Sequence, residues 1–150
     1  MKKTTITYSG LVLIISLVIV VVPIISNSQT KDSDNSYNYG VIAFSNTPPD
    51  DNNEIYIFNA NGTGLQQLTN RPGRDAGPAW SPDATQIAFY THYDNLNTWS
   101  IFKMNLDSGD IVRLTNTAGV FDSSPNWSPD GLQIMFTREY PPIFSAEIWI

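Results

Sequence analysis

The stretch that decides the fold lies at residues 79–90 and reads AWSPDATQIAFY. Its first five residues return as NWSPD at residues 126–130. Its IAF triplet also occurs at Ile42–Phe44 and returns as IMF at Ile134–Phe136, so that the copies lie 45 to 47 residues apart. A period in the forties, filled with short alternating segments, is typical of a β-propeller in which each repeat is one blade.

Two further markers recur in the same order. Leu68–Thr69 returns as Leu114–Thr115, and Ile55–Tyr56 returns as Ile101–Phe102 and again as Ile148–Trp149. Four markers at one spacing are too many for a chance agreement. The sequence therefore predicts an all-β fold, which also suits its few charged residues (15%) and its many aromatic residues (12%).

Each complete repeat predicts four strands. In the central repeat they are an inner strand that carries Trp80, a second strand over residues 86–90, a third over residues 100–105 and an outer strand over residues 111–115. The polar segments between these strands supply the turns.

The Ser-Pro-Asp triplet fits the turn between the inner and second strands, because proline holds φ at about −65° and aspartate caps the turn. The residue after the triplet is Gly131 in one copy and Ala84 in the other. If both adopt the same left-handed conformation, Ala84 costs about 1 kcal/mol. Asn61–Gly64 and Asp107–Asp110 are the matching hairpin turns between third and outer strands.

The repeat divides residues 40–150 into three blades. Blade 1 covers about residues 40–70 and lacks a WSPD strand, blade 2 covers about 78–116, and blade 3 covers about 125–150 and stops within its third strand. We therefore expect a partial β-propeller of about two and a half four-stranded antiparallel blades, whereas closed propellers have about four to eight.

This incomplete arc has two interpretations. In the first, the chain is part of a longer protein, and the missing first strand of blade 1 comes from the C-terminus and locks the ring. In the second, copies of this chain self-associate through their open blade edges to close a ring.

The segments AWSPDATQIAFYT and IFKMNLDSGDIVRLTN resemble the TolB-type, WD-like β-propeller repeat. The usual form of that repeat is roughly P-x-W-S-P-D-G-x-x-I-A-F, then I-Y, a D-G-type turn and L-T. The similarity extends over about residues 40–150 and implies a propeller. Such blades serve in binding proteins, hydrolase accessory domains and lyases, so the resemblance does not select one function. TolB itself carries an α/β domain ahead of its propeller, whereas a short tether precedes the first blade here, so a relative of TolB is expected.

Residues 1–30 have the layout of an export signal. Lys2 and Lys3 precede an apolar run, Leu11–Ile25, and a polar stretch follows it. No A-x-A cleavage pattern is present, and the mostly apolar segment Ile6–Ser26 is long enough to span a bilayer as an N-terminal hydrophobic helix. We expect a signal peptide or a retained signal anchor, and the other interpretation is a buried helix of a soluble domain.

The charges set the orientation and the location. The two lysines precede the apolar run and all fourteen acidic residues follow it, so the folded part is expected outside the cytoplasmic membrane. Residues 31–39 read as a polar tether. We expect an exported protein that is periplasmic, cell-surface or extracellular, and that contacts the membrane through its N-terminal segment if this is not cleaved.

The formal charge of −6 excludes some classes of partner and chemistry. From Lys31 onward, six basic residues stand against fourteen acidic ones and form no cluster, so nucleic acid is not an expected partner. The chain has no cysteine, which excludes disulfides, thiol nucleophiles and cysteine-ligated metals.

No residue is predicted to be catalytic, cofactor-binding or metal-ligating. His92 is the single histidine, and Asp94 is its local companion in the loop after the second strand. An exposed loop position is therefore favoured over a general base or a zinc ligand. No G-x-S-x-G nucleophile elbow occurs. For these 150 residues we lean towards a protein that is not an enzyme and needs no cofactor.

Acidic residues gather in or beside the loops that join second and third strands, on one rim of the predicted ring. They are Asp50, Asp51, Glu54, Asp94 and Glu139. Such a rim can bind a divalent cation or a basic partner, but solvated loops are the more common case.

Other residues have a structural and a functional interpretation. Trp80 and Trp127 could stack on a carbohydrate, but their identical place in the repeat favours blade packing. Two tripeptides fit the N-glycosylation pattern. Asn61 lies at a hairpin tip and can be an acceptor, whereas Asn126 lies in a predicted buried strand.

Two function hypotheses follow from the sequence. The first is a non-catalytic scaffold in the cell envelope that uses the rim or central channel of a complete propeller to hold a protein or an envelope polymer. The second is the accessory propeller of a peptidase-like hydrolase, or a propeller-type polysaccharide lyase, whose catalytic part is missing from this chain. Further WSPD repeats after residue 150 would favour the first, and an α/β segment with a nucleophile motif would favour the second.

Overall fold

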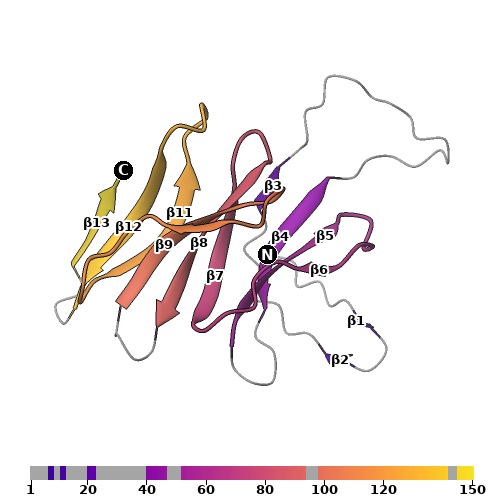
Figure 1. Ribbon diagram of the computed structural model, residues 1–150, viewed down its shortest axis with the longest axis horizontal. Coiled ribbons are helices and arrows are strands. Elements are labelled where there is room, and N and C mark those ends of the chain that lie inside the picture. Colours follow the sequence, from indigo (N-terminus) through magenta and orange to yellow (C-terminus); the bar gives the residue numbers. More distant parts are fainter. Residues whose placement is uncertain are drawn as a thin grey trace.

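The computed structural model covers most of the predicted propeller. It describes residues 40–46, 52–93, 98–141 and 145–150, together with the backbone of residues 7–8, 11–12 and 20–22. These segments form strands and turns and contain no helix (Figure 1). Within them, no helical segment is available that could cross a membrane. The predicted tether and most of the predicted N-terminal helix lie outside the described residues.

Blade 2 is a four-stranded antiparallel sheet, as the repeat predicts. Its strands, in order across the sheet, are β7 (Arg74–Trp80), β8 (Gln86–Tyr93), β9 (Thr98–Asn105) and β10 (Ile111–Arg113). β8 and β9 extend further towards their shared loop than predicted, because their pairing continues to Tyr93 and Thr98.

Blades 1 and 3 flank this sheet. Blade 1 contains β4 (Val41–Asn46), β5 (Glu54–Asn59) and β6 (Gln66–Gln67), and blade 3 contains β11 (Phe121–Trp127), β12 (Ile134–Tyr140) and β13 (Ser145–Trp149). The short β3 (Val20–Val22) pairs with β4, and β1 (Thr7–Tyr8) pairs with β2 (Leu11–Val12). One parallel bridge between Phe121 and Trp99 joins β11 to β9, so that blades 2 and 3 form one hydrogen-bonded sheet. Figure 1 shows the three blades in chain order, with blade 2 between blades 1 and 3.

The hydrophobic core lies between blades 1 and 2. It consists of Ala43 and Ile55 from blade 1 and Trp80, Ile87, Phe89, Phe102 and Met104 from blade 2. Alternate residues of β8 and β9 reach it, because successive side chains of a strand point to opposite faces. Each of the larger side chains contributes roughly 1.5–3 kcal/mol by leaving water. Contact between blades is therefore the main source of stability.

The Ser-Pro-Asp triplet closes its turn through a set of short hydrogen bonds. Ser81 Oγ donates to Asp83 Oδ1 at 2.6 Å and accepts from the backbone N–H of Gln86 at 2.9 Å. The backbone N–H of Thr85 also donates to Asp83, at 3.1 Å. Hydrogen bonds from Ser81 and then Thr85 favour the ionised carboxylate and lower the pKa of Asp83. The copy in blade 3 forms the same bonds, which explains why the triplet recurs.

The recurring Leu-Thr pair has an equally local explanation. Thr69 Oγ1 accepts the backbone N–H of Ile55 at 2.9 Å, and Thr115 Oγ1 accepts the backbone N–H of Ile101 at 2.9 Å. Each threonine lies just after the outer strand, and its hydroxyl accepts a hydrogen bond from a backbone N–H of the third strand. The Leu-Thr marker and the marker at Ile55 and Ile101 recur together because this hydrogen bond joins them.

The residue after each Ser-Pro-Asp triplet is left-handed, as predicted. Ala84 has a φ of 58° and Gly131 has a φ of 72°. Alanine is strained in this region because its Cβ crowds the backbone, whereas glycine has no Cβ.

A second left-handed position lies at the bulge of each inner strand. It is Gly77 in β7, with a φ of 61°, and Ser124 in β11, with a φ of 54°. A Cβ on Gly77 would lie 2.8 Å from the Tyr90 ring, so only glycine fits there. Thr137 takes the place of Tyr90 in blade 3, and its smaller side chain is compatible with serine at the bulge.

Replacing Ala84 by glycine should raise the free energy of unfolding by about 1 kcal/mol, because the strain at this residue is removed. Gly131→Ala should lower it by a similar amount. A Cβ on Gly131 meets no atom closer than Pro82 Cδ at 3.6 Å, an ordinary contact, so this variant isolates backbone strain. Urea unfolding followed by tryptophan fluorescence measures both changes. Equal stabilities of Ala84→Gly and the parent chain would contradict the prediction.

Candidate functional site

Buried carboxylates lie near the start of the inner strands. Asp75 on β7 and Asp122 on β11 occupy the same place in the repeat, and both have an exposed fraction of 0%. Each lies directly opposite a second-strand residue, which is Thr91 for Asp75 and Arg138 for Asp122. A buried carboxylate needs a partner that compensates its lost hydration.

In blade 3 this partner is an arginine. Arg138 Nε lies 2.7 Å from Asp122 Oδ1, and Arg138 Nη2 lies 2.8 Å from Asp122 Oδ2. The hydrogen bond to Asp122 raises the pKa of Arg138, and the guanidinium lies 4.4 Å from the centre of the Trp149 ring. This two-point ion pair holds β11 against β12.

In blade 2 the partners come from two sides. Asp75 accepts a hydrogen bond from Thr91 Oγ1 at 2.6 Å and pairs with Arg71 Nε at 3.1 Å. The Arg71 guanidinium in turn lies 4.3 Å from the centre of the Phe102 ring. The backbone N–H of Asp75 donates to the carbonyl of Asn53 in blade 1 at 2.7 Å. This cluster connects blades 1 and 2.

Glu54 lies beside the loop as predicted, at the first residue of β5, but it is buried and not on an exposed rim. Its exposed fraction is 2%, and it accepts hydrogen bonds from Thr69 Oγ1 at 2.6 Å and from Asn52 Nδ2 at 2.7 Å. Burial raises the pKa of Glu54 above its usual value, and the nearby Asp75 adds to this shift.

The remaining acids of the predicted rim do not form a cluster in the described segments. Glu139 is half-buried on β12. Asp50, Asp51 and Asp94 lie outside the described residues. Across the segments that the structure describes, no three histidine, aspartate or glutamate side chains come close enough to hold a metal ion.

His92 lies on β8 and not in a loop, contrary to the sequence prediction. It is half-buried opposite Trp99, and the two rings meet edge to face with centroids 5.5 Å apart. Trp99 also stacks on Tyr90 and on Phe121, with centroids 5.4 Å and 5.0 Å apart. These four rings form an aromatic cluster between blades 2 and 3. Burial raises the pKa of the Tyr90 hydroxyl.

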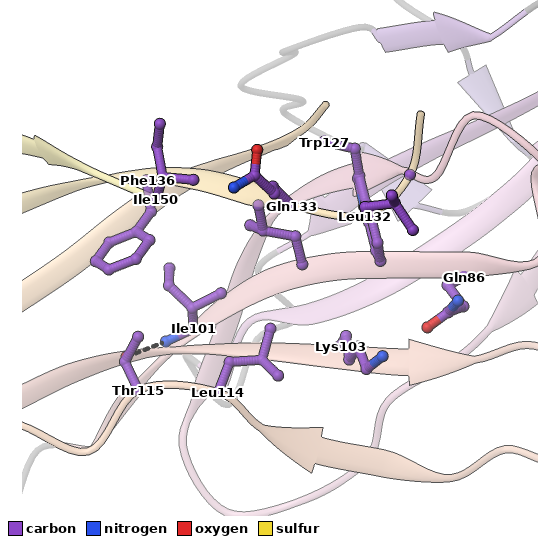
Figure 2. A pocket seen from close by; sticks show the side chains of 12 residues that line it. Gln86, Ile101, Lys103, Leu114, Thr115, Trp127, Leu132, Gln133, Phe136 and Ile150 are labelled. Atoms are coloured by element: carbon purple, nitrogen blue, oxygen red, sulfur yellow. Dashed lines mark hydrogen bonds between the residues drawn. The ribbon is translucent and has the colours of Figure 1, made fainter. Parts of the chain in front are cut away.

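A groove of about 510 Å³ also lies between blades 2 and 3 (Figure 2). Ile101, Lys103 and Leu114 line its blade 2 side, while Trp127 and Phe136 line its blade 3 side. Figure 2 shows these two sets of side chains on opposite sides of the groove. Its lining is mainly apolar and contains no acidic residue.

The contact between blades 1 and 2 explains this groove. There Met104 on the third strand of blade 2 belongs to the core cluster, and Leu106 in the following turn and Ile111 on the outer strand pack against that cluster. These residues follow Phe102, whose counterpart in blade 3 is Trp149. The groove occupies the place between blades 2 and 3 that corresponds to this packing between blades 1 and 2.

The tryptophans of the WSPD motif pack between blades. Trp80 belongs to the core cluster with an exposed fraction of 8%. Trp127 donates its indole N–H to the carbonyl of Ala79 in blade 2 at 3.1 Å. Both side chains face the preceding blade, which agrees with the packing interpretation.

The two candidate glycosylation sites are both exposed, whereas the sequence predicted that Asn126 is buried. Asn61 is exposed in its turn, where its Oδ1 accepts from the backbone N–H of Thr63 at 3.0 Å. Asn126 lies on β11 as predicted, but its side chain is exposed and not buried. Its counterpart Ala79 is only 4% exposed because blade 3 covers it.

Sequence reasoning missed the buried aspartates. Asp75 and Asp122 lie 47 residues apart and form a D-x-x-P-x-W pattern with the prolines and tryptophans that follow them. The same self-alignment that revealed WSPD contains this signal. Arg71 and Arg138 had no such signal, because they reach the aspartates from different places in the repeat.

Comparisons with known proteins agree with this geometry. The family model for the TolB beta propeller domain matches residues 38–146. The putative TolB from Agrobacterium tumefaciens has a TM-score of 0.62 and 26% identity, over 73% of this chain and 37% of that chain. TolB from Acinetobacter baumannii has a TM-score of 0.56 and 23% identity, over 71% and 28% of the two chains. The propeller domain of the Trilobed protease from Pyrococcus furiosus has a TM-score of 0.51 and 18% identity, over 67% and 30%.

Among curated proteins, none matches this sequence. The chain spans 37% or less of each of the three solved structures described above.

Asp122→Asn should lower the free energy of unfolding by roughly 3–5 kcal/mol, because it leaves the Arg138 guanidinium buried without a counter-charge. Asp107→Asn is the matched control. Asp107 is exposed in a hairpin turn, and its replacement should change stability by no more than about 0.5 kcal/mol. Urea unfolding of both variants makes the comparison, and equal effects would show that the ion pair does not hold the blade.

Glu54→Gln should gain stability relative to the parent chain as the pH rises from 4.5. The pKa of Glu54 is raised in the folded protein from a usual value of 4.5, so the folded state binds this proton more tightly than the unfolded state does. The resulting stability is complete below the usual pKa and is lost as the pH rises through the folded pKa. Glutamine stays neutral and avoids this loss. Urea unfolding across this range tests the prediction, and a difference that does not vary with pH would contradict it.

Proposed function

Because the chain belongs to the TolB β-propeller domain family, we propose that it is an exported, non-catalytic scaffold that binds a protein or an envelope polymer. One observation carries the proposal. In the described blades, the polar side chains that recur from repeat to repeat are bonded within the fold. The WSPD serines and aspartates close turns, the Leu-Thr threonines complete third strands, and the inner-strand aspartates hold neighbouring strands.

This use of the polar groups has a consequence for binding. A side chain that holds a turn or a strand cannot be released for chemistry without a cost in stability. Specific binding must therefore come from positions that differ between the blades. The exposed acidic side chains Asp107 and Asp110 are of this kind, because blade 1 has Asn61 and Gly64 at the same places, and they favour a partner with basic or cationic groups.

The N-terminal sequence supports the location. Two lysines, an apolar run and a polar stretch are the components of an export signal, and a cleaved or retained signal would place the blades outside the cytoplasmic membrane. A scaffold there meets envelope proteins and polymers.

A second candidate is the accessory propeller of a hydrolase or a lyase. The propeller domain of the Trilobed protease, which has the same fold, is part of a protease. At 18% identity this likeness shows a shared fold alone. The scaffold function is favoured because the recurring polar groups have structural partners in the described blades.

Affinity capture from envelope extracts tests the proposal. The full chain should retain a defined protein or polymer, and added salt should weaken the interaction because exposed charges contribute to it. The test variant carries Asp107→Asn and Asp110→Asn together, changes at exposed positions that should keep the fold and reduce the amount captured. Capture of no partner, together with hydrolysis of a peptide or a polysaccharide, would favour the second candidate.

A further inference from the structure

The hairpin turn of blade 1 contains the only Asn-Gly pair of the sequence, Asn61–Gly62. Both residues are exposed. Apart from the chain neighbours, no heavy atom lies within 4 Å of the place that a Cβ on Gly62 would take. Glycine has no side chain to keep its backbone nitrogen away from the side-chain amide of the asparagine before it. The turn therefore exposes two groups to water that can react with each other.

Thr63 prepares the side-chain amide of Asn61 for this reaction. The backbone N–H of Thr63 donates to Asn61 Oδ1 at 3.0 Å, and Thr63 Oγ1 donates to the same oxygen at 2.7 Å. When a nucleophile adds to Asn61 Cγ, negative charge develops on Oδ1. Hydrogen-bond donors that are already directed at that oxygen stabilise this charge.

One hydrogen bond opposes the reaction. The backbone N–H of Gly62, which supplies the nucleophile, donates to the carbonyl of Asn59 at 2.8 Å. The nitrogen must lose its proton before it adds to Cγ, so this bond has to open first. Asn59 and Gly62 are both exposed, and water replaces an exposed turn hydrogen bond at little net cost. The bond therefore slows the reaction but does not block it.

We propose that Asn61 is a site of spontaneous deamidation. The Gly62 nitrogen gives its proton to a base from solvent and forms a bond to Asn61 Cγ. The bond between Cγ and Nδ2 breaks, and Nδ2 takes up a proton and leaves as ammonia. Water then adds to either carbonyl carbon of the cyclic imide, and the C–N bond of that carbon breaks. The products are aspartate and isoaspartate, each with a carboxylate in place of the neutral amide.

The hairpin turn of blade 2 already has the charge that this reaction creates. Asp107 takes the place of Asn61 there and is exposed. Deamidation thus converts the neutral turn of blade 1 to the acidic type of blade 2. It excludes glycosylation of Asn61, because both modifications use Nδ2. On the proposed scaffold function, on which this last step relies, the added charge strengthens the binding of a basic partner.

Asn105 provides a control within the same chain. Its Oδ1 also accepts two hydrogen bonds, from the backbone N–H groups of Asp107 and Ser108, both at 2.9 Å. The residue that follows is Leu106, whose side chain packs against the core cluster. The backbone N–H of Leu106 donates to the carbonyl of Thr85 at 3.0 Å. Leu106 therefore keeps its nitrogen from the amide, and Asn105 should persist.

Incubation of the full chain in mildly alkaline buffer tests the proposal. The protein is produced in a host without N-glycosylation, and mass spectrometry of its peptides follows each asparagine with time. Asn61 should be converted first, with isoaspartate among the products, while Asn105 stays unchanged. The rate should rise with pH, because the Gly62 nitrogen must lose its proton.

Gly62→Ala is the matched variant. A Cβ at this position meets no atom outside the chain neighbours, so the change adds a methyl group beside the nucleophile without a clash elsewhere. Conversion of Asn61 should become slower by about tenfold, the effect of a barrier about 1.4 kcal/mol higher. Urea unfolding of the variant checks that the blades remain folded.

Two results would overturn the proposal. They are an intact Asn61 after other asparagines have been converted, and equal conversion rates for Gly62→Ala and the unmodified chain. The binding step has its own measurement, in which Asn61→Asp should raise the amount of partner captured from envelope extracts. An unchanged capture, together with conversion of Asn61, would count against the basic partner of the proposed function and leave the modification site established.

Discussion

A blade of this protein buries its apolar side chains only where a neighbouring blade covers them. Ile101 and Ile148 occupy the same position of the third strand, yet Ile101 is 0% exposed beneath blade 3 and Ile148 is 72% exposed. Ala88 and Met135 differ in the same way, at 0% and 42%. The strands and turns of blade 3 form as in blade 2, so local structure does not require the neighbour. Burial of the apolar side chains does require the neighbouring blade, and this burial supplies most of the stability.

This division between local structure and burial explains which predictions succeeded. The Ser-Pro-Asp turn and the left-handed Ala84 followed from the sequence because their contacts lie within five residues. Asn126 was predicted buried, but its exposure depends on whether another blade covers β11. His92 was predicted in a loop, but strand β8 extends to include it. The length of a strand is set by its pairing with the next strand, and the sequence of a single repeat does not reveal how far this pairing extends.

Blades 2 and 3 each have a buried aspartate on the inner strand, but the residues that compensate its charge differ between these blades. Both inner-strand aspartates are buried and both are compensated, by Arg71 with Thr91 in one blade and by Arg138 in the other. At the bulge of the inner strand, blade 2 pairs the small Gly77 with the large Tyr90, and blade 3 pairs Ser124 with Thr137, which are both of intermediate size. Such exchanges couple positions from different strands. Sequence periodicity detects the recurring member of each pair, and the compensating member becomes visible only in three dimensions.

The same reasoning separates architecture from function in the candidate site. The positions that recur in this chain are occupied with holding turns, strands and blades together, and the apolar groove has the character of a space between blades. What differs from blade to blade is the length of the loops between second and third strands and the exposed charge. A propeller of this type can therefore change its partner by changing those loops, while every blade continues to close by the same few hydrogen bonds. Under the proposed scaffold function, the binding specificity of this chain must be sought in the positions that break the repeat.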